Sequence, residues 1–211
     1  MYKYILWDND GVLVDTEGLF YRTTRRVFQE LGLDLEEDTY HEYMIRGETS
    51  WTIPRQAGMP EALIQEAIAR RDDYYREQLQ NENIEIPGVS EVLQQLAASH
   101  AMAIVTTASR QYFGWIHDDR DLVRHMQFVL TYEDYPRAKP APDPYLMALQ
   151  RFNAAPHEAV VIEDTERGLR SAVAAGIDCI IVRNEFSSSH DFSAARHILG
   201  SVSELPEILH A

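Results

Sequence analysis

The chain is poor in cysteine and lacks long apolar runs. Cys179 is the single cysteine among 211 residues, which excludes an intrachain disulfide and suits a reducing compartment. No stretch approaches the ~20 apolar residues of a membrane-spanning helix, and the apolar run before Asp8 is too short for a signal peptide. We therefore expect a cytoplasmic protein with no membrane partner.

The chain also lacks basic clusters, and its formal net charge is -15. Nucleic-acid binding depends on clustered Lys and Arg that neutralise phosphates, so we expect no nucleic-acid partner. A molecule this acidic repels an anionic substrate, so a site that binds such a substrate must supply local positive charge. The hydrophobic share of 45% is enough for a packed core, and a monomer is the default expectation.

Short apolar runs alternate with amphipathic segments along most of the chain, which predicts a parallel sheet covered on both faces. The predicted strands are Tyr4 to Trp7, Met102 to Val105, Phe128 to Leu130, Ala159 to Ile162 and Cys179 to Val182. The predicted helices between them include Val89 to Ala98, Pro144 to Phe152 and Glu166 to Ala175.

One connection is far longer than an ordinary loop between a strand and a helix. More than seventy residues separate the first strand from Pro87-Gly88, and they hold three helical patterns: Gly18 to Leu31, Leu35 to Met44 and Pro60 to Leu79. We predict an α/β fold, with a Rossmann-like parallel sheet core at residues 1–16 and 86–211. A helical cap subdomain is inserted at residues 17–85.

Two carboxylates follow the first predicted strand. Asp8 and Asp10 are two residues apart, so on an extended chain they project to the same side. Paired carboxylates favour a cation, and Mg²⁺ prefers oxygen ligands. The alternative is a simple turn, because Asp, Asn and Gly are turn-forming residues.

Three further polar groups follow later strands. Thr107 and Ser109 carry hydroxyls at the predicted start of a helix, where backbone N–H groups are also free to bind an anion. The alternative is that one of these hydroxyls simply caps the helix. Lys139 lies among prolines that stiffen its loop, where it neutralises a phosphate or is merely solvated. Glu163 and Asp164 form a second acidic pair, which meets a cation or starts a helix. All of these positions fall at the same edge of the predicted sheet.

Together these motifs resemble those of the haloacid dehalogenase superfamily, and the likeness covers nearly the whole chain. The branch that it resembles most contains β-phosphoglucomutase and sugar-phosphate phosphatases, which carry a helical cap after the first motif. The residues that carry the resemblance are Asp8-Asn9-Asp10-Gly11-Val12, Thr107, Lys139-Pro140-Ala141-Pro142-Asp143-Pro144-Tyr145 and Glu163-Asp164.

The resemblance implies a role for each of these positions. Asp8 would attack phosphorus and form an aspartyl-phosphate, while Asp10 would act as general acid and then as general base. Thr107 would bind the phosphoryl oxygens, and Lys139 would balance their charge. The implied Mg²⁺ ligands are Asp8, the backbone carbonyl of Asp10, Asp164 and, directly or through water, Glu163.

We expect the phosphate or substrate to be contacted also by Gly11, Ala108 and Ser109. Arg46 in the insert either contacts a substrate anion or is a solvated side chain at a helix end. The function implied is a Mg²⁺-dependent phosphohydrolase that acts on a small phosphorylated metabolite, such as a sugar phosphate. A phosphotransferase of the β-phosphoglucomutase kind is the main alternative. A phospho-accepting signalling domain is less favoured because of the long insert, and a non-catalytic binding protein because every chemical position is occupied.

Departures from the family pattern narrow these expectations. Dehalogenases of the superfamily lack the second Asp, so Asp10 argues against dehalogenation. β-Phosphoglucomutases carry a cap His and a cap Arg where this chain has Phe20 and Ser50, which favours hydrolysis over mutase activity. Asn9 occupies a position that is commonly apolar in the family, and the sequence offers no account of it. His117 shows no metal-ligand spacing and is assigned no role.

Overall fold

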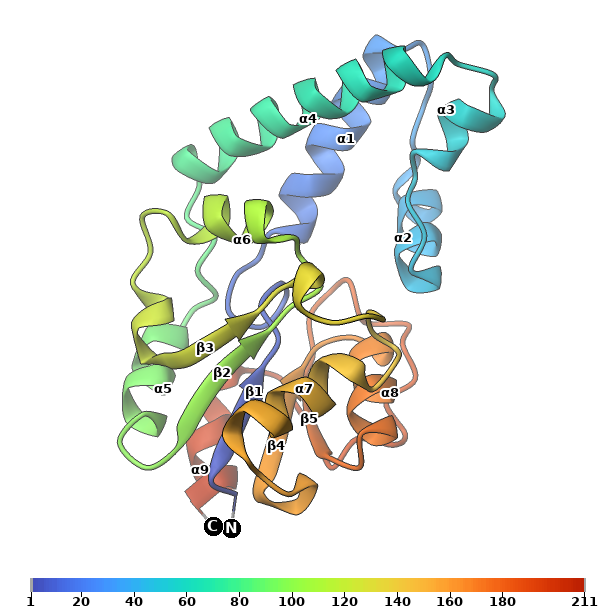
Figure 1. The fold of residues 1–211 in the computed structure, drawn as a ribbon. Helices are drawn as coiled ribbons and strands as arrows, with labels where there is room; N and C mark the ends of the chain where they lie inside the picture. The colour runs from blue at the N-terminus through green and yellow to red at the C-terminus, as the bar shows by residue number, and fades with distance from the viewer. Residues whose placement is uncertain (1, 211) are drawn as a thin grey trace. The chain divides into compact units, whose positions relative to one another are not determined.

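The computed structural model describes residues 2–210 and divides the chain into two compact units (Figure 1). One unit consists of the residues up to Asp15 together with those from Glu85 onward, and the other runs from Thr16 to Ile84. Each boundary lies one residue from the predicted limits of the insert, 17–85.

The first unit contains one parallel six-stranded sheet in the order β3-β2-β1-β4-β5-β6. At its centre, Tyr4 of β1 pairs with Ala101 of β2 on one side and with Ala159 of β4 on the other. The strands are β1 Tyr4–Trp7, β2 Ala101–Val105, β3 Met126–Leu130, β4 Ala159–Glu163, β5 Asp178–Val182 and β6 His197–Leu199.

The central strands are buried on both faces because helices cover each side. Leu6, Val105 and Val161 point into a core shared with Tyr145 of α7 and Leu169 of α8. Figure 1 shows α5 and α9 behind the sheet, opposite α7 and α8. The helices of this unit are α5 Val89–Leu96, α6 Arg110–His117, α7 Asp143–Phe152, α8 Glu166–Ala174 and α9 Leu205–His210. The short 3₁₀ helices are η1 Leu122–His125, η2 Tyr132–Asp134, η3 Pro156–Glu158 and η4 Val202–Glu204.

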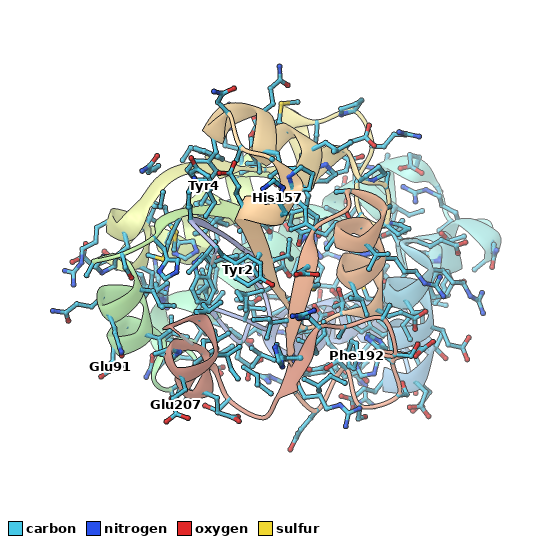
Figure 2. All side chains as sticks on the ribbon, turned by 90° about the horizontal axis from the view of Figure 1, so that it is seen from below. Tyr2, Tyr4, Glu91, His157, Phe192 and Glu207 are labelled. Carbon is cyan, nitrogen blue, oxygen red and sulfur yellow. The ribbon has the colours of Figure 1, made fainter. Side chains whose placement is uncertain are left out.

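The amino ends of the strands lie away from the predicted chemistry. Tyr2 and Tyr4 mark the start of β1 in Figure 2, and His157 marks the turn before β4. The Tyr2 hydroxyl donates to Asp178 Oδ2 over 2.6 Å at the start of β5. The opposite, carboxyl edge of the sheet is the one that meets ligands in open α/β folds.

The second unit is entirely helical across its described residues. Its core is aromatic, with Phe28 of α1 packed on Trp51 and with Tyr40 of α2 fully buried. The guanidinium carbon of Arg71 lies 4.1 Å from the centroid of the Phe20 ring. The Phe20 ring also meets the Tyr75 ring edge-on. The helices are α1 Glu17–Glu30, α2 Glu37–Arg46, α3 Thr52–Gln56 and α4 Glu61–Asn81.

The predicted fold class is confirmed, although several elements differ in detail. A sixth strand, β6, adds to β5, and two short helices, α3 and α9, were not predicted from the sequence. The second helix of the insert is Glu37–Arg46 rather than Leu35 to Met44. None of the helices within residues 2–210 has the length and hydrophobicity that crossing a lipid bilayer requires.

Candidate active site

Three neighbouring strands deliver the predicted chemical groups to one edge of the sheet. Asp8 follows β1, Thr107 lies two residues beyond β2, and Asp164 follows β4. β1 lies between β2 and β4 in the sheet. The adjacent carboxyl ends of parallel strands therefore gather residues that are up to 156 positions apart in the chain.

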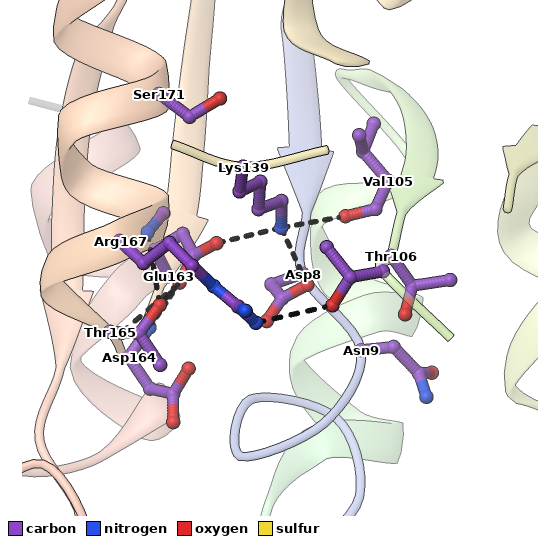
Figure 3. A network of polar contacts seen from close by, with 12 residues as sticks. Asp8, Asn9, Val105, Thr106, Lys139, Glu163, Asp164, Thr165, Arg167 and Ser171 are labelled. Carbon is purple, nitrogen blue, oxygen red and sulfur yellow. Dashed lines mark hydrogen bonds and ion pairs between the residues drawn. The ribbon is translucent and has the colours of Figure 1, made fainter. Parts of the chain in front are cut away.

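A buried ammonium group lies at the centre of the site. Lys139 Nζ donates to Asp8 Oδ1 and to Glu163 Oε1, over 2.7 Å in each case, and to the Val105 carbonyl over 2.9 Å (Figure 3). These three bonds use all three donors of the ammonium group. Only 2% of the Lys139 side chain is exposed, so its charge is directed at the two carboxylates.

Glu163 is held by donors on both of its oxygens. Oε1 accepts from the Tyr145 hydroxyl as well as from Lys139, over 3.0 Å and 2.7 Å. Oε2 accepts from the backbone N–H groups of Asp164 and Thr165, over 3.0 and 3.1 Å, and from the Thr165 hydroxyl over 2.9 Å. The Glu163 carboxylate is thus fixed by protein groups and in turn orients Lys139.

The carboxylates of this site perturb one another. Burial raises the pKa of Asp8, and the charge of Glu163 raises it further, although Lys139 works in the opposite direction. Burial, Glu163 and Asp8 likewise raise the pKa of Asp164 well above its ordinary value. Burial opposes the charged form of Lys139 too, but Asp8 and Glu163 outweigh it and raise the pKa of the ammonium. The cluster therefore holds more negative charge than Lys139 neutralises.

A hard divalent cation fits this excess of negative charge. Asp8, Glu163 and Asp164 each offer a carboxylate oxygen, and these oxygens lie within 4.8 Å of one another. Oδ1 of Asp164 is buried, and within residues 2–210 it has no hydrogen-bond partner. A buried carboxylate oxygen without a donor is expensive unless a cation meets it. The donor set, all oxygen, is the one that Mg²⁺ prefers.

The Asp8 loop approaches Asp164 closely enough to require glycine. Gly11 has a φ of +80°, and a Cβ atom there would lie 2.1 Å from Asp164 Oδ2. Asn184, just after β5, donates to the same Oδ2 over 2.7 Å and reaches the Gly11 carbonyl over 3.4 Å. Asn184 thereby sets the direction of the Asp164 carboxylate.

Asp10 and Thr107 lie beside this cluster. Asp10 Oδ2 accepts from Asn9 Nδ2 over 3.3 Å and from the Thr106 hydroxyl over 3.4 Å. The Thr107 hydroxyl accepts from Arg167 Nη2 over 3.4 Å. Arg167 reaches from α8 toward Asp8 (Figure 3), and through its contact with Thr107 it brings a second cation to the site.

The four residues predicted to contact phosphate or substrate occupy different surroundings. The Gly11 N–H donates to the Val14 carbonyl over 2.8 Å, and the Ala108 N–H to the Thr106 hydroxyl over 3.0 Å. Ser109 caps α6 by accepting from the Tyr112 N–H, which matches the capping alternative. Arg46 belongs to the helical unit, where it ends α2, is exposed and pairs with Glu42.

Several neighbours of the site received no role from the sequence. Asn184 follows a predicted strand at the same sheet edge, and that position could have drawn attention to it. Tyr145 lies within the lysine motif but carried no separate chemical signal. Arg167 and His117 lie within helices, where charged and polar residues are ordinary, so no local pattern singled them out.

Comparisons with known proteins identify the family of this chain. The model of the haloacid dehalogenase-like hydrolases matches residues 5–182. A phosphorylated carbohydrates phosphatase from Thermotoga maritima is 28% identical over 83% of this chain and 82% of its own length. The fructose-1-phosphate phosphatase YqaB from Escherichia coli is 28% identical over 86% of this chain and 97% of its own length.

A solved structure extends the likeness to the whole fold. The crystal structure of CbbY from Rhodobacter sphaeroides in complex with phosphate superposes with a TM-score of 0.81 at 25% identity. The match covers 97% of this chain and 96% of that chain. The chain therefore belongs to the haloacid dehalogenase-like hydrolase family, and it is a phosphatase of that family.

Proposed function

We propose that this phosphatase is a Mg²⁺-dependent phosphomonoesterase that cleaves a small phosphorylated sugar through an aspartyl-phosphate intermediate. The observation that carries the proposal is the buried contact of Asp8 with Lys139. Beside it lies the second acidic pair, in which Oδ1 of Asp164 has no hydrogen-bond partner among residues 2–210. Lys139 and a bound cation both favour the ionised form of Asp8, the form that attacks phosphorus.

In the first half of the reaction Asp8 is the nucleophile. One of its carboxylate oxygens forms a bond to phosphorus while the bond between phosphorus and the ester oxygen breaks. Asp10 donates its proton to the departing alkoxide, which leaves as the sugar alcohol. Lys139 and the Thr107 hydroxyl stabilise the negative charge on the transferring phosphoryl oxygens.

In the second half water regenerates the enzyme. Asp10, now a carboxylate, takes a proton from the attacking water. The oxygen of that water bonds to phosphorus, and the bond from phosphorus to Asp8 breaks. Inorganic phosphate leaves, with Asp8 ionised and Asp10 protonated again, so protons and charge balance over the cycle.

Asp8, Asp164 and the Asp10 backbone carbonyl would hold the cation, with Glu163 as a ligand directly or through water, and Glu163 also fixes Lys139. When bound, Mg²⁺ supplies positive charge to Asp8 and to the phosphoryl oxygens. Because the net charge of the protein is -15, an anion-binding site needs local positive charge, and the cation would provide it.

The relatives support a phosphorylated sugar as substrate. Two of them are named for phosphatase activity on phosphorylated carbohydrates and on fructose 1-phosphate. Hydrolysis rather than mutase chemistry is favoured by Phe20, which replaces the cap His of the mutases and packs against Arg71 and Tyr75 inside the helical unit.

The proposal is tested by phosphate release from a panel of sugar phosphates, in Mg²⁺ and in EDTA. We expect release in Mg²⁺ only, and its loss in the variants Asp8→Asn and Asp10→Asn. Asp119→Asn, at an exposed carboxylate outside the site, should match the wild type. Product analysis by phosphorus NMR would reveal an isomerised sugar phosphate if the enzyme were a mutase. Undiminished release from Asp8→Asn would contradict the proposal.

A further inference from the structure

Asn9, the residue between the two aspartates, is completely buried and makes side-chain contacts in two directions (labelled in Figure 3). Its Oδ1 lies 2.7 Å from Nε2 of His117, and its Nδ2 donates to Asp10 Oδ2 over 3.3 Å. His117 is the last residue of α6, 108 positions away in the chain. One carboxamide thus joins a buried imidazole to the carboxylate of Asp10.

The chemistry of these groups fixes the direction of each hydrogen bond. The carbonyl oxygen of Asn9 only accepts, so Nε2 of His117 must carry a hydrogen and donate it. The alternative, a rotated carboxamide with the ring hydrogen on Nδ1, would bury that N–H without an acceptor among the described residues and turn Oδ1 of Asn9 toward the Asp10 carboxylate. The His117 contact therefore turns the NH₂ group of Asn9 toward Asp10.

The protonation state of His117 agrees with this assignment. Burial, with a smaller effect of Arg120, lowers the pKa of His117 to about 4. The imidazole is therefore neutral near pH 7 and carries one ring hydrogen, at Nε2. Its Nδ1 is buried and makes no hydrogen bond within residues 2–210, so His117 acts as a donor to Asn9 alone.

Asn9 and His117 are both held firmly in place. The backbone carbonyl of Asn9 accepts from the N–H groups of Leu13 and Val14, over 2.9 and 3.2 Å, which closes the loop after β1. His117 is 9% exposed and packs on the Phe113 ring, with 4.4 Å between the centroids. The side-chain NH₂ group of Asn9 and the hydroxyl of Thr106 converge on the same Asp10 oxygen, Oδ2.

We propose that Asn9, oriented by the hydrogen bond from His117, is a positioning residue that sets the rotation of the Asp10 carboxylate for proton transfer. This inference rests on the proposed function, in which Asp10 is the general acid and base. Proton transfer depends on geometry before anything else. Removing either member of the pair lowers the rate of the proton-transfer steps without removing the nucleophile.

The test compares Asn9→Leu, His117→Leu and His117→Gln in full-length protein with Mg²⁺. The amide nitrogen of Gln can replace Nε2 as the donor to Asn9, whereas Leu cannot. We expect kcat for a sugar phosphate to fall roughly tenfold in both Leu variants, with KM within about twofold. His117→Gln should retain about half of the wild-type kcat or more. His157→Leu, at an exposed histidine, is the control.

A second substrate distinguishes positioning from a general structural effect. Acetate leaves acetyl phosphate without being protonated, so the transfer of its phosphoryl group to Asp8 needs little help from Asp10. With enzyme in excess, consumption of acetyl phosphate in a single turnover should fall by less than threefold in the Leu variants. Circular dichroism melts identify variants that do not fold. If Asn9→Leu does not fold, the two His117 variants carry the comparison.

The outcomes separate the two proposals. An active wild type with unaffected Leu variants overturns this inference alone. Equal losses with the sugar phosphate and with acetyl phosphate, or a Gln variant as slow as the Leu variant, show a structural role and also overturn it. A wild type that releases no phosphate from any ester overturns the proposed function and, with it, the role of Asp10.

Discussion

The carboxylate of Glu163 occupies the space beside Gly168 that a side chain would need. A Cβ atom on Gly168 would lie 1.7 Å from Glu163 Oε1. The five hydrogen bonds to Glu163 hold that carboxylate in place, so it cannot swing aside without losing them. Glycine at this position of α8 is therefore what lets Glu163 remain in contact with Lys139.

Gly168→Ala should displace Glu163 and loosen the site. We expect the free energy of unfolding to fall by about 2 kcal/mol, because a buried carboxylate loses part of its hydrogen bonding. Denaturation in urea measures the change. Gly114→Ala in α6 is the matched control, since a Cβ atom there would meet no neighbouring group within 4 Å. Alanine is favoured in helices by up to ~1 kcal/mol, so the control should be neutral or stabilising. Equal effects of the two substitutions would contradict the prediction.

Lys139→Met should leave Asp8 and Glu163 without their shared cation. Breaking a buried ion pair on one side typically destabilises by about 3–5 kcal/mol, and we expect a loss in that range in EDTA. Phosphatase activity should be lost as well. Adding Glu163→Gln removes one of the two uncompensated charges, so the double variant should regain stability but not activity. A single variant as stable as the wild type would show that the ion pair carries no net stabilisation.

Asn184→Leu should weaken Mg²⁺ binding without removing a ligand. Asn184 donates to Asp164 Oδ2 over 2.7 Å, and residues that orient a metal ligand typically change affinity by about 10–100-fold. We expect a rise in the Kd for Mg²⁺ of this size, measured by isothermal titration calorimetry. Asn81→Ala, at an exposed asparagine of α4, should leave the Kd unchanged. An unaltered Kd in Asn184→Leu would show that Asn184 does not contribute to Mg²⁺ binding.

His117 should make stability depend on pH in the acid range. Burial lowers its pKa in the folded protein to about 4, whereas the unfolded chain titrates near ~6.5. As the pH falls below ~6.5, the unfolded chain binds a proton before the folded protein does. The stability that the neutral imidazole contributes is therefore complete above ~6.5 and is lost as the pH falls through the folded pKa.

The measurement is urea denaturation of the wild type and of His117→Gln, both in EDTA, at several pH values from 7 to 4. The stability of the wild type relative to the variant should decrease by up to roughly 3 kcal/mol across this range. Parallel pH profiles would mean that His117 does not titrate with a lowered pKa.

Much of the sheet could be predicted because its signals are local. β1 has the predicted bounds, Tyr4–Trp7, since a short apolar run bounded by polar residues marks a buried parallel strand. β6 escaped prediction because only one of its three residues is buried, and so short a pattern cannot be told from a loop. Ser109 shows the limit of such signals, since a hydroxyl at a helix start caps the helix as readily as it meets an anion.

The sequence by itself determined which chemical groups stand at the carboxyl edge of the sheet. Asp8, Lys139 and Asp164 follow buried runs or lie in a stiffened loop, and parallel strands bring such positions together whatever the details of packing. Only the tertiary structure decided which side chains orient them. His117 meets Asn9, and Asn184 meets Asp164, through the packing of elements that are distant in the chain. No periodicity or spacing encodes such contacts, because they depend on how the elements are placed against one another in three dimensions.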